Sequence, residues 1–153
     1  MALAIALAAL LVVLCAVGIV MWTRLAASNQ RIIGAPGGEP EALYRGGVMA
    51  RHVVTSGTLA RLELFDWGVR LRGTPISRWL VPTWEATYDE LAIAELVALP
   101  ASRNAIWFRL RGERSGIAFL SDFNLVILPK LEKHGVPVNR SVTKIRRVEE
   151  LYD

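Results

Sequence analysis

The sequence is poor in the residues that most often carry chemistry. It contains one cysteine and two histidines, and more than eighty residues separate His52 from His134. A single cysteine excludes an intramolecular disulfide, and a histidine metal site would need carboxylate ligands at a suitable spacing, which the sequence does not offer. Gly46-Gly47 lacks the Lys-Ser/Thr pair that completes a phosphate-binding loop. We therefore expect no enzymatic activity, no metal and no cofactor.

Charge is absent from Ala2 to Trp22, a run of 21 residues dominated by Leu, Val, Ile and Ala. At about 1.5 Å per residue a helix of this length reaches roughly 30 Å, the thickness of a bilayer's hydrocarbon core. A cleaved signal peptide carries Lys or Arg before a shorter apolar core, and nothing basic precedes this run. We expect an uncleaved transmembrane helix over residues 1–23. The alternative, a cleaved signal, rests on Ala26-Ala27-Ser28, which resembles a weak cleavage site.

The basic residues indicate an orientation for this span. Arg24 and Arg31 follow it, whereas only the α-amino group precedes it. The positive-inside rule then predicts a single-pass protein of the cell membrane with its C-terminal domain in the cytoplasm. The lack of cysteine after the span is compatible with that compartment.

About 130 residues remain after the span, enough for one domain with its own core. Gly34 to Pro40 is a cluster of Gly and Pro that neither helix nor strand tolerates. We therefore expect a flexible spacer over residues 24–45, a domain over 46–138 and a charged C-terminal tail over 139–153.

Within the domain, alternating apolar and polar residues predict strands. Leu59–Phe65 and Val69–Leu71 form a hairpin around Asp66-Trp67-Gly68. Further strands are expected over Ala92–Leu99, Ala105–Arg111 and Ile117–Leu120, with a short one over Arg78–Val81.

A helix is predicted after these strands, because apolar residues then recur at a spacing of four. Ser121 can cap it and Gly135 can end it. Pro129 either kinks this helix or lies in its first turn, with the helix starting near Leu128. The expected buried face consists of Phe123, Ile127, Leu131 and His134.

Strands followed by one closing helix resemble the pleckstrin-homology (PH) superfold, and the residues resemble its bacterial PH-like members. The resemblance is carried by Gly57–Leu71, by Trp84 with Tyr88-Asp89-Glu90-Leu91, and by Leu131–Val138. Small membrane-anchored proteins of actinobacteria combine such a domain with an N-terminal span. The resemblance implies a mainly β fold, a curved sheet sandwich or barrel closed by a C-terminal helix and preceded here by one transmembrane helix.

The resemblance does not imply recognition of a phosphorylated inositol lipid. Lipid-binding members carry a basic cluster between their first two strands, and here that turn is taken to be Asp66-Trp67-Gly68, which is short and acidic. The net charge of +4 allows weak, non-specific contact with anionic lipid. Nucleic acid is not expected as a partner, because Glu63, Asp66 and Glu113 interrupt the basic residues.

Arginines at alternate strand positions are the main candidates for a binding surface. An exposed Trp beside Arg is common in protein interfaces, whereas an ordinary polar sheet face would explain the same pattern. Glu85, Asp89 and Glu90 are interpreted as a solvated turn. The candidate interaction surface comprises Arg61, Arg70, Arg72, Trp107, Arg109 and Arg111.

The tail offers a second candidate. Arg140, Lys144, Arg146 and Arg147 precede three acidic residues, and Ser141 can cap a short helix. A helix that orders on a partner and a disordered terminus explain these residues equally well.

The sequence thus favours a non-enzymatic, single-pass membrane protein whose PH-like domain is an interaction module for a protein partner at the cytoplasmic membrane face. The alternative is an accessory subunit of a larger membrane complex, in which the span packs against other helices. Ala9, Ala16 and Gly18 are small enough to allow that approach.

Overall fold

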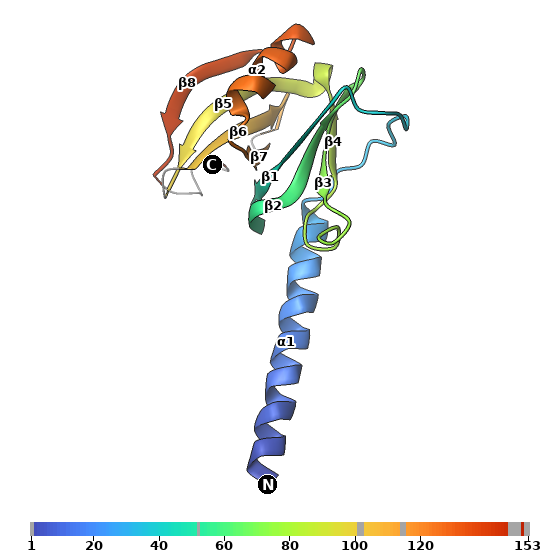
Figure 1. Ribbon diagram of the computed structural model, residues 1–153, viewed down its shortest axis with the longest axis vertical. Coiled ribbons are helices and arrows are strands. Elements are labelled where there is room, and N and C mark those ends of the chain that lie inside the picture. Colours follow the sequence, from blue (N-terminus) through green and yellow to red (C-terminus); the bar gives the residue numbers. More distant parts are fainter. Residues whose placement is uncertain (1, 52, 101–102, 114–115, 147–150, 152–153) are drawn as a thin grey trace.

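The computed structural model describes residues 2–51, 53–100, 103–113, 116–146 and 151. Its N-terminal element is one long helix, α1 (Ala2–Ser28), which projects as an isolated rod from a β-rich domain (Figure 1). The segment Ile5–Leu25 is long and apolar enough to cross a membrane, with a mean hydropathy of 2.8, and its residues up to Met21 are all exposed. The helix therefore extends six residues beyond the uncharged run that ends at Trp22.

The domain is built on one open sheet. Its order is β4-β3-β2-β1-β7-β6-β5-β8, and all neighbours are antiparallel except the parallel pair β5 and β8. The strands are Ala42–Ala50 (β1), Val53–Leu64 (β2), Gly68–Gly73 (β3), Trp84–Thr87 (β4), Leu91–Leu99 (β5), Arg103–Leu110 (β6), Gly116–Leu120 (β7) and Val138–Lys144 (β8).

Seven consecutive antiparallel strands followed by a helix, α2 (Asn124–Lys133), form the order expected of a PH-like domain. The predicted fold class is therefore confirmed. Alternation explains most of the strands: Leu62 and Leu64 of β2 and Val69 and Leu71 of β3 face inward, in register across the hairpin. These inner residues join those of β5, β6 and α2 in the main core, in which Phe108 is fully buried.

The first strand is β1, which the sequence pattern missed. The connection between the first two strands therefore follows Ala50, and Arg51 in it is an exposed turn residue. Asp66-Trp67-Gly68 instead joins β2 to β3. These residues therefore belong to the second hairpin, and the expectation that they form the turn between the first two strands was wrong. The predicted strand over Arg78–Val81 is also wrong, since this segment is a series of turns between β3 and β4.

Two glycines, Gly46 and Gly47, allow β1 to pair with β2 on one side and with β7 on the other, and so to connect strands β1 to β4 with strands β5 to β8. The β1–β2 register shifts between Gly46 and Val48, and β1 pairs with β7 from Gly47 onward. A Cβ on Gly46 would lie 2.2 Å from the carbonyl oxygen of Leu120, closer than any side chain tolerates. Gly46 therefore permits the close contact at which the sheet bends.

Helix α2 packs its buried side chains Ile127, Leu128 and Leu131 into the main core. Pro129 lies inside the helix, not in its first turn. It deprives the carbonyl of residue 125 of a partner, and Leu125 is an exposed residue, so water can supply that hydrogen bond. Phe123 is exposed, contrary to expectation, and lies near the ring of Tyr44.

A short 3-10 helix, η1 (Tyr88–Glu90), connects the two halves and is tied to α2 and β2. The Tyr88 ring stacks on His134 at a centroid distance of 4.2 Å, and its hydroxyl donates to the carbonyl of Phe65 at 2.7 Å. Burial raises the pKa of Tyr88, and the negative charges of Glu41 and Asp66 raise it further. The hydroxyl is thereby held in its neutral, hydrogen-bonding form.

The domain continues beyond Val138, where the sequence analysis ended it. Val138–Lys144 forms β8, parallel to β5 at the free edge of the sheet. This part of the tail is therefore neither a helix nor disordered. Leu151 is buried, and Arg147 lies outside the described residues.

Candidate functional site

The domain is joined to the end of α1 by direct contacts. The indole Nε1 of Trp22 donates to the carbonyl of Leu80, in the loop between β3 and β4, at 3.3 Å. Trp22, Thr23 and Leu25 are half-buried, in contrast to the exposed helix before them. Ser28 Oγ and Asn29 Nδ2 both donate to the carbonyl of Leu25, at 2.7 and 2.9 Å, and so satisfy a carbonyl at the end of the helix.

The segment after α1 runs along the edge strand β4. Arg31 N donates to Thr83 O at 2.9 Å, and Glu85 N donates to Arg31 O at 2.8 Å, which makes a parallel bridge between Arg31 and Trp84. Ile33 N donates to the carboxylate of Glu85 at 3.1 Å. The first part of the expected flexible spacer is thus held on the domain, and it covers one edge of the sheet.

Side chains strengthen this attachment. The Arg31 guanidinium pairs with Glu90 at 2.6 Å, and the Glu90 carboxylate also accepts from Thr87 N at 2.9 Å. The hydrogen bond from Arg31 lowers the pKa of Glu90, the bonds from Thr87 lower it further, and partial burial opposes the shift. The prediction that Glu85, Asp89 and Glu90 form a solvated turn holds for Asp89, which is exposed, but not for Glu85, which is buried.

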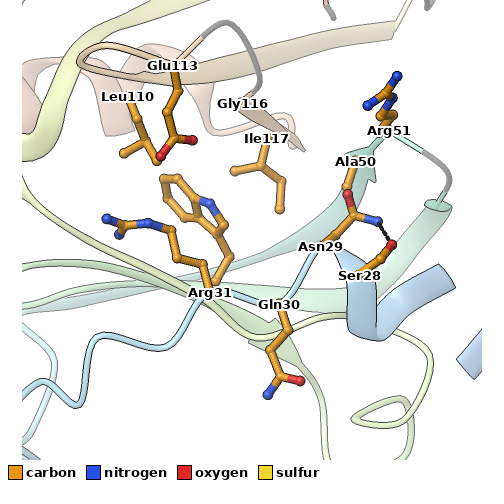
Figure 2. Close-up of a pocket in the computed structure, with 11 residues that line it drawn as sticks. Ser28, Asn29, Gln30, Arg31, Ala50, Arg51, Leu110, Glu113, Gly116 and Ile117 are labelled. Atoms are coloured by element: carbon orange, nitrogen blue, oxygen red, sulfur yellow. Dashed lines mark hydrogen bonds between the residues drawn. The ribbon is translucent and has the colours of Figure 1, made fainter. Parts of the chain in front are cut away.

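A cavity of about 370 Å³ lies where α1 meets the domain. Figure 2 shows Leu110 and Ile117 on one side of it and Asn29 and Arg31 on the other, while the Arg51 side chain extends away. The volume is within the range of small-molecule sites. Among the described residues, no group of three or more His, Cys, Asp or Glu side chains is suited to hold a metal ion. The remaining lining residues are Ser28, Gln30, Ala50, Trp84, Glu113 and Gly116.

The predicted arginines of the first hairpin have separate roles. Arg70 Nε pairs with Glu85 at 2.7 Å, and its guanidinium lies 4.9 Å from the Phe65 ring centroid and 5.5 Å from that of Trp67. Because both charge and cation–π contacts hold it, Arg70 is part of the domain's own structure and is poorly placed to bind a partner.

Arg61 and Arg72, in contrast, belong to a row of like charges. They are directly paired across β2 and β3, and Arg61 is paired on its other side with Arg45 of β1. Arg72 contacts Glu63 at 2.8 Å. Glu63 is only 1% exposed, and its Oε2 makes no hydrogen bond with the described residues. We call Arg45, Arg61 and Arg72 the arginine row; Arg45 escaped the sequence analysis because β1 did.

The second predicted group does not form an exposed Trp–Arg surface. Trp107 is 3% exposed, and the expectation that it faces solvent was wrong. It lies in a second apolar cluster on the outer face of β1, β7, β6 and β5, beneath Leu151 and the partly buried Ile145. Arg109 and Arg111 are exposed, on the opposite half of the sheet from the arginine row.

The tail candidates are also dispersed. Arg140 in β8 pairs with Glu132 of α2, with both side chains more than half exposed. Lys144, at the end of β8, and Arg146, just after it, are exposed. The structure thus brings Arg61 and Arg72 together but does not gather the tail cations into one site.

Comparison with known proteins adds little to this description. No protein-family model matches the chain, and no curated protein matches its sequence. Among solved structures, the chain is similar to one described as "Structure of the Spt16D Pob3N heterodimer", with 11% identity and a TM-score of 0.45. That match covers 72% of this chain and 60% of the other. The fold class therefore rests on the strand order and the closing helix.

Proposed function

We propose that the chain is a non-enzymatic, single-pass membrane protein that presents its PH-like domain to a protein partner at the cytoplasmic membrane face. The observation that carries this proposal is the join between α1 and the domain. A helix of membrane-spanning length is held on the domain by Trp22, in its last turns, and by Arg31, just after its end. A domain mounted in this way keeps one orientation relative to the bilayer and offers the same face to each partner.

The arginine row is the surface that best suits a partner. Like charges directly opposite one another destabilise a sheet, and the row has one buried carboxylate, Glu63, among its neighbours. Arg45 is exposed, and the Arg72 side chain is 44% exposed. An acidic surface on the partner would offset this repulsion, which favours electrostatic recognition of a protein.

Membrane topology is tested by thiol labelling of the full chain, with Cys15 replaced by Ala. A cysteine at Glu113, an exposed position in the β6–β7 loop, should resist an impermeant reagent in intact cells and react after permeabilisation. A cysteine placed before α1 should show the opposite behaviour. Labelling at position 113 in intact cells would overturn the cytoplasmic orientation.

Partner binding is tested by purification from membranes with two matched charge reversals. Arg45→Glu alters the arginine row, and Arg109→Glu alters another exposed position, on the other half of the sheet. We expect a partner that is retained by Arg109→Glu and lost with Arg45→Glu. A partner that both variants retain would show that the arginine row is not its binding surface.

One observation favours the alternative, an accessory subunit of a membrane complex. The described side chains of α1 up to Met21 are all exposed, and a Cβ on Gly18 would meet nothing within 4 Å, so a neighbouring helix can approach there. A stoichiometric partner that Arg45→Glu retains and Gly18→Leu releases would support this alternative.

A further inference from the structure

The loop between β3 and β4, residues 74–83, carries two large apolar side chains that the domain does not use. Ile76 is 85% exposed and Trp79 is 52% exposed. Val81, in the same loop, is instead buried and belongs to the main core. Apolar side chains that are grouped on a surface, and not scattered singly, are typical of protein or membrane contact sites.

This exposure is built into the loop. Ser77 is buried, and its hydroxyl donates to the carbonyl of Leu59 and lies 2.8 Å from Thr74 Oγ1. Backbone bonds from Ser77 N to Thr74 O and from Leu80 N to Ser77 O, both at 2.9 Å, close successive turns. Because Ser77 fastens the loop to β2, Ile76 and Trp79 are held outward by the fold.

The contact between Trp22 and Leu80 sets the depth of the loop. If Ala2 to Trp22 spans the hydrocarbon core, Trp22 lies at its boundary, where tryptophan is enriched. The loop that accepts the Trp22 hydrogen bond then lies at the same level. Figure 1 shows this loop beside the domain end of α1.

The polar groups of the loop are compatible with that environment. Trp79 Nε1 donates to the carbonyl of Ile76 at 3.1 Å, so two polar groups that lipid would leave unpaired are already satisfied. Residues 74–83 contain no acidic side chain, and exposed Arg78 lies between the two apolar residues. An apolar pair with an intervening cation suits the boundary of an anionic bilayer.

We propose that the β3–β4 loop is a second membrane contact, in which Ile76 and Trp79 enter the interfacial layer of the bilayer beside α1. This inference rests on the proposed membrane anchoring. It makes the lipid surface the partner of the loop, and it fixes the domain against the bilayer at two points instead of one.

The test uses the full chain with Cys15 replaced by Ala, in vesicles of phosphatidylcholine with a minor fraction of phosphatidylglycerol. A fluorescent nitrobenzoxadiazole label is attached to single cysteines introduced as Met21→Cys, Ile76→Cys or Leu125→Cys. All three positions are exposed in the protein, so labelling does not disturb the core. Lipids with a nitroxide group near the headgroup quench labels that enter the membrane.

We expect quenching at position 76 of at least roughly half that at position 21, as an interfacial depth requires, and none at position 125, on α2. Quenching at 21 without quenching at 76 would overturn the inference and leave the anchor intact. A label at 76 that is shielded from water but is not quenched by the nitroxide lipids would also overturn it, since protein then covers the loop. Quenching at neither position would reject the membrane anchor as well.

Discussion

The two halves of the sheet have outer faces of opposite character. In the half formed by β1 to β4, the outer face is polar: Glu63 and Glu85 are buried there beside arginines, with Ile33 of the spacer bonded to Glu85. In the half formed by β5 to β8, it carries an apolar cluster that Met49 of β1 joins, and Trp107 lies there beneath the C-terminal segment. Both faces have the same sequence signature, arginine at alternate strand positions.

The difference shows that alternation assigns a residue to a face without saying what covers that face. Glu63 is buried among guanidinium groups, and Trp107 is buried by residues that follow it by some forty positions. A charged face covered by charges depends on its ion pairs, whereas an apolar face depends on burial of area. Four changes, three substitutions and a change of pH, should distinguish stabilisation by ion pairs from stabilisation by buried apolar area.

The largest effect is expected at Trp107. Trp107→Ala should lower the free energy of unfolding by about 3–5 kcal/mol, because a buried indole is lost and a cavity remains. Chemical denaturation of the full chain in detergent, followed by circular dichroism, measures the loss. Trp79→Ala, at an exposed indole, should change it by less than about 0.5 kcal/mol. A loss below about 1 kcal/mol at Trp107 would mean that the outer face of this half is open.

A smaller loss is expected at Arg72. Arg72→Ala should cost about 1–3 kcal/mol, because it leaves the buried Glu63 carboxylate without its ion-pair partner. Arg109→Ala, at an exposed arginine of the other half, is the matched control and should be nearly neutral. Adding Glu63→Gln to Arg72→Ala should recover part of the loss in the same denaturation measurement. Equal effects at Arg72 and Arg109 would contradict the contrast between the two faces.

Acidification should loosen the segment after α1. The pKa of Glu90 is lowered in the folded protein from its usual 4.5, so its contribution to stability is present above that value and is lost as the pH falls through the lowered pKa. Hydrogen exchange at the amides of Arg31 and Glu85, expressed as protection factors, should fall by roughly two- to fivefold, since a partly exposed pair contributes at most about 1 kcal/mol. Glu90→Gln should abolish this pH dependence of the protection factors. If the variant keeps the same pH dependence, the ion pair does not control exchange at these amides.

The smallest effect is expected at the exposed pair between Arg140 and Glu132. Arg140→Ala should change the free energy of unfolding by no more than about 0.5 kcal/mol, and added salt should remove even that difference. Denaturation at low and high ionic strength measures both quantities. A larger, salt-resistant loss would show that β8 is held at the sheet edge by its charges.

Local pattern was sufficient for much of the fold. The apolar run of α1, the β2–β3 hairpin, the strands β5 to β7 and a helix after them were all predicted from period and turn residues. Apart from α1, which was predicted from its length and lack of charge, each of these elements has one face in the main core, which is the condition under which period is informative. The order of these predicted elements along the chain then indicated a PH-like fold.

Two of the missed strands, β1 and β8, fail that condition. From Gly46 to Ala50 every residue of β1 is buried, because Val48 lies in the main core and Met49 in the second cluster, so no alternation is visible. β8 is polar and mostly exposed, and only its parallel pairing with a distant strand defines it. The candidate site was wrong at two points: Arg45 was omitted with β1, and Trp107 was taken as exposed because the segment that covers it is remote in sequence.

The join between the two halves has a mechanical consequence. β1 and β7 share only three paired residues, whereas β1–β2 and β5–β6 share eight each. The segment after α1 is fastened on the β4 side and β8 is at the opposite edge. Tension between these two edges would pull across the strands and break their hydrogen bonds in succession. Once the force exceeds what the packing of the main core withstands, we expect β1 and β7 to separate first, beside Gly46 and Gly47.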